Sequence, residues 1–401
     1  MSLKYTIRNF VRNHIPESMV MKYKMAHSTK YPIVKNPLDY FQPVYHIKDD
    51  TWEPLHMPEI YQMSKPYDLE VFHGKQDILL IPNAQVSDNS DIVITEHGVV
   101  WDKYYNRVFS KVVPMDRGLL TYNQEYVCVR NANITEYYEG KCISMLGVFE
   151  GIWSHFLVQF LPKLYYAEEA GLLDENVTIL LPSYKDKQIA QLVNDILSRH
   201  PSVNVSEICK KEGRLSFRCD ELYYIPTASC ISNHLQAINF YDCVIPNRVQ
   251  TILRERVVKS YVDPKNELPS EYEKLYLVRR GIRNATNVNE IENYFISKGF
   301  KLVDPGAMTL EEKICIFNYA KYIAGPASSA WSNVIFCNGC KALNLRNLNR
   351  VTDPFSCFLM PIGNVQTLIL TGWDLERDIH SSYTISIEDL NEAYLNFFHK
   401  Q

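Results

Sequence analysis

The pattern of hydrophobic and polar positions changes along the chain from short apolar stretches to alternating strands and helices. Between residues 67 and 130, stretches such as 77–81 and 91–95 are separated by turn signals, which predicts a small antiparallel β layer. From about 142 to 225, strand-like stretches alternate with helix-like ones, and residues 270–346 repeat this order. Such alternation indicates parallel sheets with helices on both faces, so we expect an α/β protein.

The first alternating block is defined by apolar runs and the residues that end them. Gly171 follows a long apolar helix pattern, and the run 177–181 after it has the aliphatic composition of a buried strand. In chain order we expect a strand near 142–147, a helix over about 152–170, strand 177–181, a helix near 185–199, and strands near 204–208 and 221–225.

The second block has clear signals at its helix starts. Asn287 with Glu290, and Thr309 with Glu312, have the spacing of capping boxes, and Gly299 is placed to end the first of these helices. The order predicts a Rossmann-like half-sheet, whose binding site lies outside the carboxyl ends of its strands. The expected strands are 275–278, 300–303, 322–324 and 342–345, and a third helix begins at Ser328 or Ser329.

Two such blocks predict two Rossmann-like domains that face a cleft. Residues 67–245 form the first domain with the β layer, and residues 246–401 form the second, with a linker near Asp242–Asp263. Residues 1–66 form an N-terminal extension. Six prolines within 31–66 predict an extended surface segment without regular structure.

The first thirty residues carry a basic amphipathic pattern. Leu3, Ile7, Phe10 and Val11 recur at helical spacing, with basic side chains between them. Residues 1–30 hold six basic residues and one acidic residue, a charge of +5, whereas the whole chain has a net charge of −4. The segment is either a surface helix packed on its own domain or a peripheral anchor on an anionic membrane.

Composition narrows the class of protein. The chain is 46% hydrophobic and 12% aromatic, without a run of eighteen uncharged apolar residues, which favours a folded protein with no transmembrane segment. The net charge of −4 argues against a nucleic-acid partner, because such proteins usually carry a basic face. Ten cysteines and a start without a signal-peptide pattern favour reduced thiols and a cytoplasmic location.

Three arginines follow the first strand of the second block. Arg279 and Arg280 stand at its carboxyl end, with Arg283 shortly after. Guanidinium groups at this edge, where helix N-termini also point, are suited to hold a diphosphate bidentately. The alternative is that these are surface arginines paired with Asp or Glu.

A loop of small residues follows the third strand of the same block. Small residues let a backbone approach a ligand closely, and the N–H groups of a helix start bind anions together with serine hydroxyls. The alternative is an ordinary serine N-cap. Because the two clusters end neighbouring strands, we expect them to share a phosphate-bearing ligand. The candidate residues of this loop are Gly325, Pro326, Ser328, Ser329, Ser332 and Asn333.

In the first block, Glu150, Trp153 and His155 stand between a strand end and an apolar helix. His155 is a candidate general base because the ordinary pKa of histidine is about 6.5, and Glu150 is the competing carboxylate. The alternative for His155 is a structural role. No histidine shows metal-ligand spacing, so we expect neither an obligatory metal nor another cofactor.

These motifs together resemble the glycosyltransferase 61 family, which includes bacterial capsular-polysaccharide transferases. The resemblance covers about residues 145–346. It rests on 275–280, Asn289-Glu290, 299–306, 325–333 and 335–336 in the second block, and on 153–157 with 161–164 in the first.

Membership implies a GT-B-type fold, an inverting reaction and a nucleotide-sugar donor, typically a UDP-sugar. It implies that Arg279, Arg280 and the small-residue loop hold the donor diphosphate. The first block, with Trp153 on the acceptor side, would then hold a glycan or lipid-linked glycan, in the synthesis of a capsular or other surface polysaccharide.

Two of the motifs depart from the family pattern. Relatives usually have His and Gly where this chain has Ala327 and Ser328, and they have Asp four residues after the histidine, where this chain has Gln159. A glutamine amide cannot take a proton, which leaves His155 or Glu150 as the base. The departures also raise an alternative function, a catalytically inactive member that binds a nucleotide or glycan as an assembly component.

Overall fold

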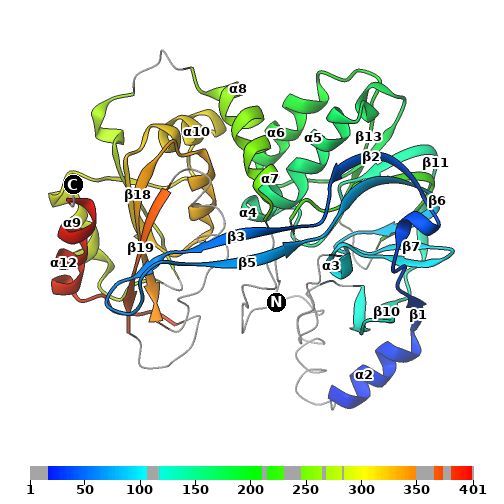
Figure 1. The fold of residues 1–401 in the computed structure, drawn as a ribbon, viewed down its shortest axis with the longest axis horizontal. Coiled ribbons are helices and arrows are strands. Elements are labelled where there is room, and N and C mark those ends of the chain that lie inside the picture. Colours follow the sequence, from blue (N-terminus) through cyan, green and yellow to red (C-terminus); the bar gives the residue numbers. More distant parts are fainter. Residues whose placement is uncertain are drawn as a thin grey trace, which may run out of the picture.

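The computed structural model describes residues 17–105, 116, 118–209, 215–229, 245–263, 268–281, 284–348, 365–373 and 381–399. Within these residues, two large sheets carry helices on their faces, and a pair of long strands runs from one sheet toward the other (Figure 1). The fold is therefore mixed α/β, which confirms the expected class.

The first sheet joins a parallel half to an antiparallel half. Its main path is β13-β12-β11-β14-β6-β7-β8, and β2 pairs with β6. The strands β11 to β14 are mutually parallel, and the chain reverses its winding between β11 and β14. The bounds are β11 (Ile134–Ser144), β12 (Thr178–Pro182), β13 (Asn204–Ile208), β14 (Ser216–Tyr224), β6 (Gln76–Ser87), β7 (Val93–Thr95), β8 (Gly98–Val100) and β2 (Gln42–Lys48).

Antiparallel β structure is present over 67–130, as expected, and most of it is continuous with the first sheet. Strand β6 pairs with the outer edge of β14 from Leu79 to Ser87, so these strands extend the first parallel sheet. A small three-stranded sheet contains β1 (Ser28–Pro32), β10 (Tyr126–Arg130) and β9 (Leu119–Tyr122), and the short α3 (Asp102–Tyr105) follows β8.

The helix after β11 is continuous but irregular. It consists of α4 (Trp153–His155), a π-helical turn η2 (Phe156–Phe160) and α5 (Leu161–Glu169). Pro162 has no N–H to donate to the preceding turn, which is a common cause of such a bulge. The helix α6 (Lys187–Leu197) lies close to the bounds expected for it, and the short η3 (Leu172–Asp174) between α5 and β12 is not among the expected helices.

The second sheet is parallel throughout, in the order β16-β15-β17-β18-β19-β4. The winding reverses between β15 and β17. Its strands are β15 (Lys274–Leu277), β16 (Lys301–Val303), β17 (Tyr322–Pro326), β18 (Cys340–Asn347), β19 (Val365–Gly372) and β4 (Glu59–Ile60), and its helices are α9 (Val288–Ser297), α10 (Leu310–Tyr319) and α12 (Ile387–Phe398), with the short η6 (Ser270–Tyr272) before β15.

Of the two capping boxes expected in this block, the structure contains one. Thr309 and Glu312 form the expected capping box. Asn287 does not cap α9 with its side chain, because its amide pairs instead with the backbone of Ile385. The expected third helix is a 3₁₀ helix, η7 (Ser329–Phe336), with Ser328 as its N-cap.

The N-terminal extension contains regular strands, so the expectation that 31–66 lacks them is wrong. After η1 (Pro37–Asp39) and β2, strands β3 (Thr51–Met57) and β5 (Tyr67–His73) form a two-stranded ribbon. Pro54 is tolerated because both strands of such a ribbon have an open edge, where the missing N–H is not needed. The ribbon reaches from the first sheet to the second, where β4 at its tip pairs with β19 (Figure 1).

The expected linker near 242–263 is a packed helix over its described residues. α7 (Asn247–Ile252), the π-helical η5 (Leu253–Val258) and α8 (Lys259–Tyr261) follow one another directly. One hydrophobic core contains their buried side chains together with Ile143 of the first sheet and Leu275 of the second. The two blocks are thus in contact, and the boundaries at 66 and 245 stay predictions.

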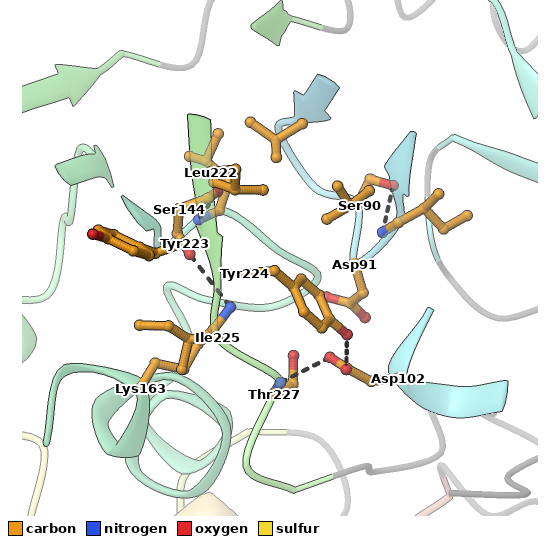
Figure 2. Close-up of a pocket in the computed structure, with 14 residues that line it drawn as sticks. Ser90, Asp91, Asp102, Ser144, Lys163, Leu222, Tyr223, Tyr224, Ile225 and Thr227 are labelled. Carbon is orange, nitrogen blue, oxygen red and sulfur yellow. Dashed lines mark hydrogen bonds between the residues drawn. The ribbon is translucent and has the colours of Figure 1, made fainter. Parts of the chain in front are cut away.

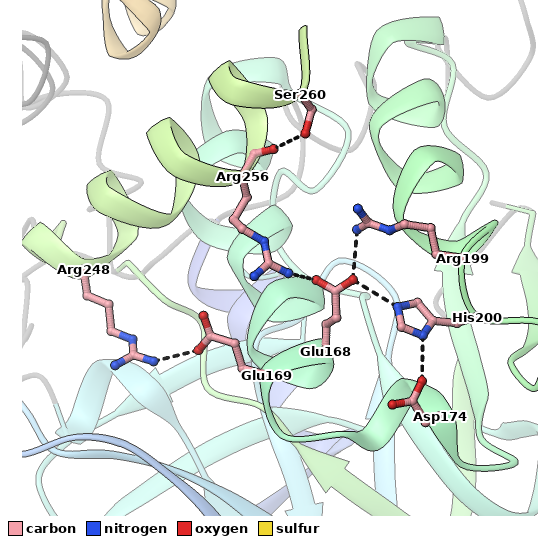
Figure 3. A network of polar contacts seen from close by, with 8 residues as sticks. All are labelled: Glu168, Glu169, Asp174, Arg199, His200, Arg248, Arg256 and Ser260. Atoms are coloured by element: carbon pink, nitrogen blue, oxygen red, sulfur yellow. Dashed lines mark hydrogen bonds and ion pairs between the residues drawn. The ribbon is translucent and has the colours of Figure 1, made fainter.

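An ion-pair network fixes this helix on α5 (Figure 3). Glu168 accepts from Arg256, from Arg199 at 2.9 Å and from His200 at 3.1 Å, and Arg248 binds Glu169 at 2.7 Å. The Glu168 side chain is 15% exposed, so these bonds are partly shielded from water.

The amphipathic positions Leu3 to Val11 lie outside the described residues. The described part of that region forms α2 (Glu17–Ala26), on which Met19 and Tyr23 are 62% and 64% exposed. Among the helices that the structure describes, none has the length and apolar character needed to cross a membrane.

Candidate active site

His155 lies at the start of the helix that follows β11, beside the carboxyl edge of the first sheet. The chain reaches it through Phe149, which has a φ of 68°, an uncommon left-handed conformation for a residue with a side chain. The Phe149 ring lies 4.9 Å from the His155 ring, centroid to centroid. The strained turn thus places an aromatic wall against the imidazole.

Gln159 determines which nitrogen of His155 carries the proton. Its Nε2 donates to the carbonyl oxygen of Ser229 at 3.0 Å, so its Oε1 faces His155 Nδ1, 2.6 Å away. Oε1 only accepts, and Nδ1 must therefore be the protonated nitrogen in the neutral ring. This places the lone pair of the imidazole on Nε2, the form that a general base needs.

Glu150 differs from His155 in its access to the outside. Glu150 is 1% exposed, whereas His155 is partly exposed. Burial raises the pKa of Tyr184 above its ordinary value, and the nearby charge of Glu150 adds to this rise. A general base must reach the proton that it removes, so the geometry favours His155 over Glu150.

Trp153 links the first block to the second. Its Nε1 donates to Oδ1 of Asn333 on η7 at 2.7 Å, and the Asn333 amide donates in turn to the carbonyl of Ala330. The ammonium of Lys313 on α10 lies 4.1 Å from the centre of the Trp153 ring. Two residues of the predicted site, Trp153 and Asn333, are therefore brought together across the two blocks.

Arg279 stands at the switch point of the second sheet, where parallel α/β sheets bind their ligands. It follows the end of β15, is partly buried, and donates from Nη1 to the carbonyl of Ala327 after β17. Its guanidinium thus lies between the two neighbouring strand ends, as the sequence predicts.

Arg280 has a different environment. Both of its terminal nitrogens bond Glu292 of α9, the second at 3.3 Å, and its side chain is 64% exposed. This is the alternative left open above, an arginine paired with a carboxylate. Arg283 lies outside the described residues.

The small-residue loop is shaped mainly by its own packing. Gly325 has a φ of 151°, and a Cβ there would lie 2.7 Å from the carbonyl oxygen of Leu277, so glycine lets β15 and β17 approach. Ser328 accepts from the N–H of Ala330 at 3.3 Å, the ordinary N-cap. The other members are Pro326, buried at the end of β17, exposed Ser329, and buried Ser332, whose hydroxyl donates to Ser329 O.

Arg346 is a basic residue that the sequence reasoning missed. It lies at the carboxyl end of β18 and is 1% exposed. Burial raises the pKa of Tyr383, and the charges of Arg346 and Arg279 both oppose this rise, which puts the two arginines near the same ring. The rule that selects Arg279, a cation at the carboxyl end of a parallel strand, also selects Arg346 once β18 is extended to Asn347.

In the part of the chain that the structure describes, no group of three or more His, Cys, Asp or Glu side chains is placed to hold a metal ion. Our expectation of a reaction without an obligatory metal or cofactor stays a prediction.

A comparison with protein-family models identifies this region. The model described as Glycosyltransferase 61 matches residues 153–343, which contain Trp153, His155, Arg279 and the small-residue loop. A search of curated proteins finds no match to the chain. The family resemblance seen in the sequence is thus confirmed.

Proposed function

We propose that this chain, whose residues 153–343 belong to the glycosyltransferase 61 family, moves a sugar from a nucleotide-sugar donor to a hydroxyl group of a glycan. Family membership supports glycosyltransferase activity in general. A UDP-sugar donor, inversion, hexosyl or pentosyl transfer, and a role in capsular or other surface polysaccharide synthesis are our proposals. The hydrogen-bonded chain from His155 through Gln159 to Ser229 carries the mechanism.

In the proposed reaction, Nε2 of His155 takes the proton of the acceptor hydroxyl as that oxygen attacks the anomeric carbon. The bond from this carbon to the diphosphate oxygen breaks on the opposite face, so the configuration inverts. Arg279, at the end of β15, stabilises the charge of the departing nucleoside diphosphate, and the buried charge of Arg346 at the end of β18 adds positive potential there without contacting it. The imidazolium then releases its proton to solvent.

Gln159 replaces only part of what a carboxylate would do at its position. Its Oε1 selects the Nδ1–H tautomer of His155, as a carboxylate would, but its amide is neutral and gives the imidazolium no charge stabilisation. His155 is therefore oriented as a base, but its imidazolium form lacks the stabilisation that a neighbouring carboxylate would give.

Substitution of His155 tests the base. We expect His155→Ala to lower turnover about 10²–10⁴-fold with unchanged nucleotide affinity, because a positioned base contributes on that order. Gln159→Leu should lower turnover as well, since it removes the acceptor that fixes the tautomer. The matched control is His56→Ala, at a histidine with a 51% exposed side chain on β3. Full turnover of His155→Ala would exclude it as the base.

Nucleotide binding tests the donor site. Thermal shifts with UDP-, GDP-, CMP- and dTDP-sugars should identify the donor, because a bound ligand raises the apparent stability. Arg279→Met should abolish the shift. If Arg280→Met also abolishes the thermal shift, both arginines bind the diphosphate. If the thermal shift is unchanged, Arg280 only forms the ion pair with Glu292.

A second candidate function is an inactive family member that binds a nucleotide or glycan as an assembly component. Two of the departures from the family pattern, Gln159 and Ala327, favour it. A nucleotide-induced thermal shift without sugar transfer or donor hydrolysis, across the same donors, would support this candidate over the enzyme.

We also propose a GT-B-type arrangement with a cleft between the blocks. The two doubly wound sheets and the bond from Trp153 to Asn333 support it. A crystal structure with the bound nucleotide tests this arrangement, and a nucleotide seated away from the carboxyl ends of β15 and β17 would contradict it.

We further propose that residues 1–30 hold the protein at the inner, anionic face of a membrane, from the cytoplasm. The charge of +5 and the exposed Met19 and Tyr23 support this. Deleting residues 2–24 should abolish co-sedimentation with phosphatidylserine vesicles and leave the thermal unfolding transition intact. Unchanged co-sedimentation would contradict the proposal.

A further inference from the structure

A cavity of about 540 Å³ lies in the N-terminal part of the molecule. It is lined by residues 35–38, by the end of β5 and the start of β6 with the turn between them, and by α3. Two of its lining residues, Tyr224 and Pro226, fall within the region that the family model matches. Its size is typical of small-molecule sites, which measure roughly 300–1,000 Å³.

Aromatic rings form part of the cavity wall and are held in place. Tyr105 donates from its hydroxyl to the carbonyl of Val34 at 2.7 Å, and the ring of Tyr104 packs edge-on against it at 5.6 Å. Phe72 packs edge-on against Trp52, which is 58% exposed on the neighbouring strand. Fixed aromatic rings suit a ligand that has an apolar face and a polar edge.

Amide groups supply the polar part of the lining, and one of them lacks a partner. Gln76 is 3% exposed, and its Nε2 donates to the carbonyl of Thr227 at 3.4 Å. Its Oε1 has no hydrogen-bond partner among the residues that the structure describes. A buried acceptor of this kind is costly, and a ligand hydroxyl would satisfy it. Asn36 and Gln124 add further amides.

Charged groups at the cavity are compensated by neighbours. Lys75 pairs with Asp77 at 3.2 Å, and Lys35 pairs with Glu125 at 2.8 Å. The lining therefore has no excess of positive charge that would select a phosphate or a nucleotide. It suits a neutral ligand rich in hydroxyl groups.

The inner wall of the cavity is rigid. Tyr224 donates to Asp102, which also accepts from the N–H of Thr227 at 2.7 Å (Figure 2). Behind this pair lies a polar pocket of about 20 Å³, enough for one water molecule, where Lys163 donates to Ser144 O at 3.3 Å. A wall fixed by buried hydrogen bonds keeps its shape when a ligand enters.

The cavity adjoins the loop that orients the candidate base. Gln76 bonds the carbonyl of Thr227, and Gln159, the partner of His155, bonds the carbonyl of Ser229. Two residues of chain span at most about 7 Å, so both amides are anchored on one short segment. A chain-like ligand in the cavity would lie beside the position where the acceptor hydroxyl meets His155.

We propose that this cavity binds a neutral oligosaccharide segment of the acceptor, at a distance from the hydroxyl that reacts. The sugar rings pack on Phe72 and Tyr104, and a sugar hydroxyl donates to Oε1 of Gln76. That the bound glycan is an acceptor rests on the proposed glycosyltransferase function; that a neutral oligosaccharide binds here does not.

The test compares Tyr104→Ala and Phe72→Ala with the wild type and with a control. The control, Tyr137→Ala, removes a 49% exposed tyrosine of β11 that does not line the cavity. A glycan array of neutral and acidic oligosaccharides identifies the ligand, and calorimetry measures its affinity. We expect neutral oligosaccharides to bind the wild type and the control, and each cavity variant to bind at least tenfold more weakly.

Transfer assays separate this proposal from the proposed function. In an active enzyme, the cavity variants should raise KM for long acceptors and leave kcat and donor hydrolysis unchanged. A wild type that binds neutral oligosaccharides through the cavity but transfers no sugar would refute the proposed function alone. Binding of acidic glycans only, no binding, or equal binding by the cavity variants would overturn the cavity proposal.

Discussion

Lys313 places a charged group between the two blocks, and its removal has a predictable effect on stability. The side chain is 3% exposed, donates to Oε1 of Gln188 on α6, and lies 4.1 Å from the centre of the Trp153 ring. Burial lowers its pKa from 10.5 to about 8, although Asp186 and Asp304 oppose the decrease. The folded protein therefore holds this proton less tightly than the unfolded chain does.

The size of the effect follows from the lowered pKa. A decrease of about 2.5 units, at about 1.4 kcal/mol per unit, corresponds to about 3.5 kcal/mol. Below pH 8 both states are protonated, and the folded state carries the full cost of the buried charge. Between about pH 8 and 10.5 the unfolded state binds more protons, so the contribution of Lys313 to the unfolding free energy rises with pH.

The variant Lys313→Met isolates this contribution. Methionine keeps a long side chain and removes the charge, so its stability relative to the wild type should be greatest at pH 7. That difference should decrease by about 3 kcal/mol as the pH rises to 10.5. Urea unfolding followed by circular dichroism, at several pH values for both proteins, measures it.

The control is Lys187→Met, at an exposed position of α6. Its difference from the wild type should change little over the same range. If the Lys313→Met difference were also constant between pH 7 and 10.5, the buried charge would not be the cause and the reasoning would be refuted.

Three further substitutions test the local structure by urea unfolding. Gly325→Ala should cost more than about 1 kcal/mol, because the new Cβ meets the carbonyl of Leu277 at a φ that alanine avoids; an unchanged midpoint would argue against this contact. Glu168→Gln should lower the free energy of unfolding by about 1.5–3 kcal/mol, because it weakens the charged hydrogen bonds to Arg256 and its neighbours. A loss below about 0.5 kcal/mol, as for a surface substitution, would show that solvent already screens these bonds. Thr309→Ala should cost about 1 kcal/mol as the capping box is lost, and Thr309→Ser should restore most of it.

The alternating blocks are predictable from the sequence because their signals are local. Apolar periodicity gives the strands and helices, and Gly171, Gly299 and Thr309 mark helix ends within a few residues of where they occur. The helix α12 begins with a similar local signal, the N-cap Ser386. It is not predicted, because it lies after the last block that the apolar periodicity defines.

The remaining features depend on contacts between distant residues. The strand β4 is two residues long, and it exists only because β19 is beside it. Arg280 forms an ion pair with Glu292, twelve residues later, because α9 brings that carboxylate back to the end of β15. The sequence predicts at which strand end a residue lies. Its binding partner depends on the neighbouring element, which the sequence pattern does not show.

The same principle explains the result at His155. Sequence position makes it a candidate, but its tautomer is set by Gln159 together with the carbonyl of Ser229, seventy residues farther along the chain. In the sequence, a glutamine at the position of a carboxylate indicates the loss of a proton acceptor. In the structure, its Oε1 still accepts from Nδ1 of His155 and orients the ring.

The pairing of β4 with β19 also affects the order in which this protein assembles. Glu59 pairs with Leu368, 309 residues later, so a segment made early waits for one made near the end of synthesis. Until then the last parallel strand has no neighbour at its outer edge, and open strand edges favour pairing with other chains. The edge closes only when the ribbon of the same chain docks. Protein concentration should therefore affect the competing pairing with other chains and not the docking itself.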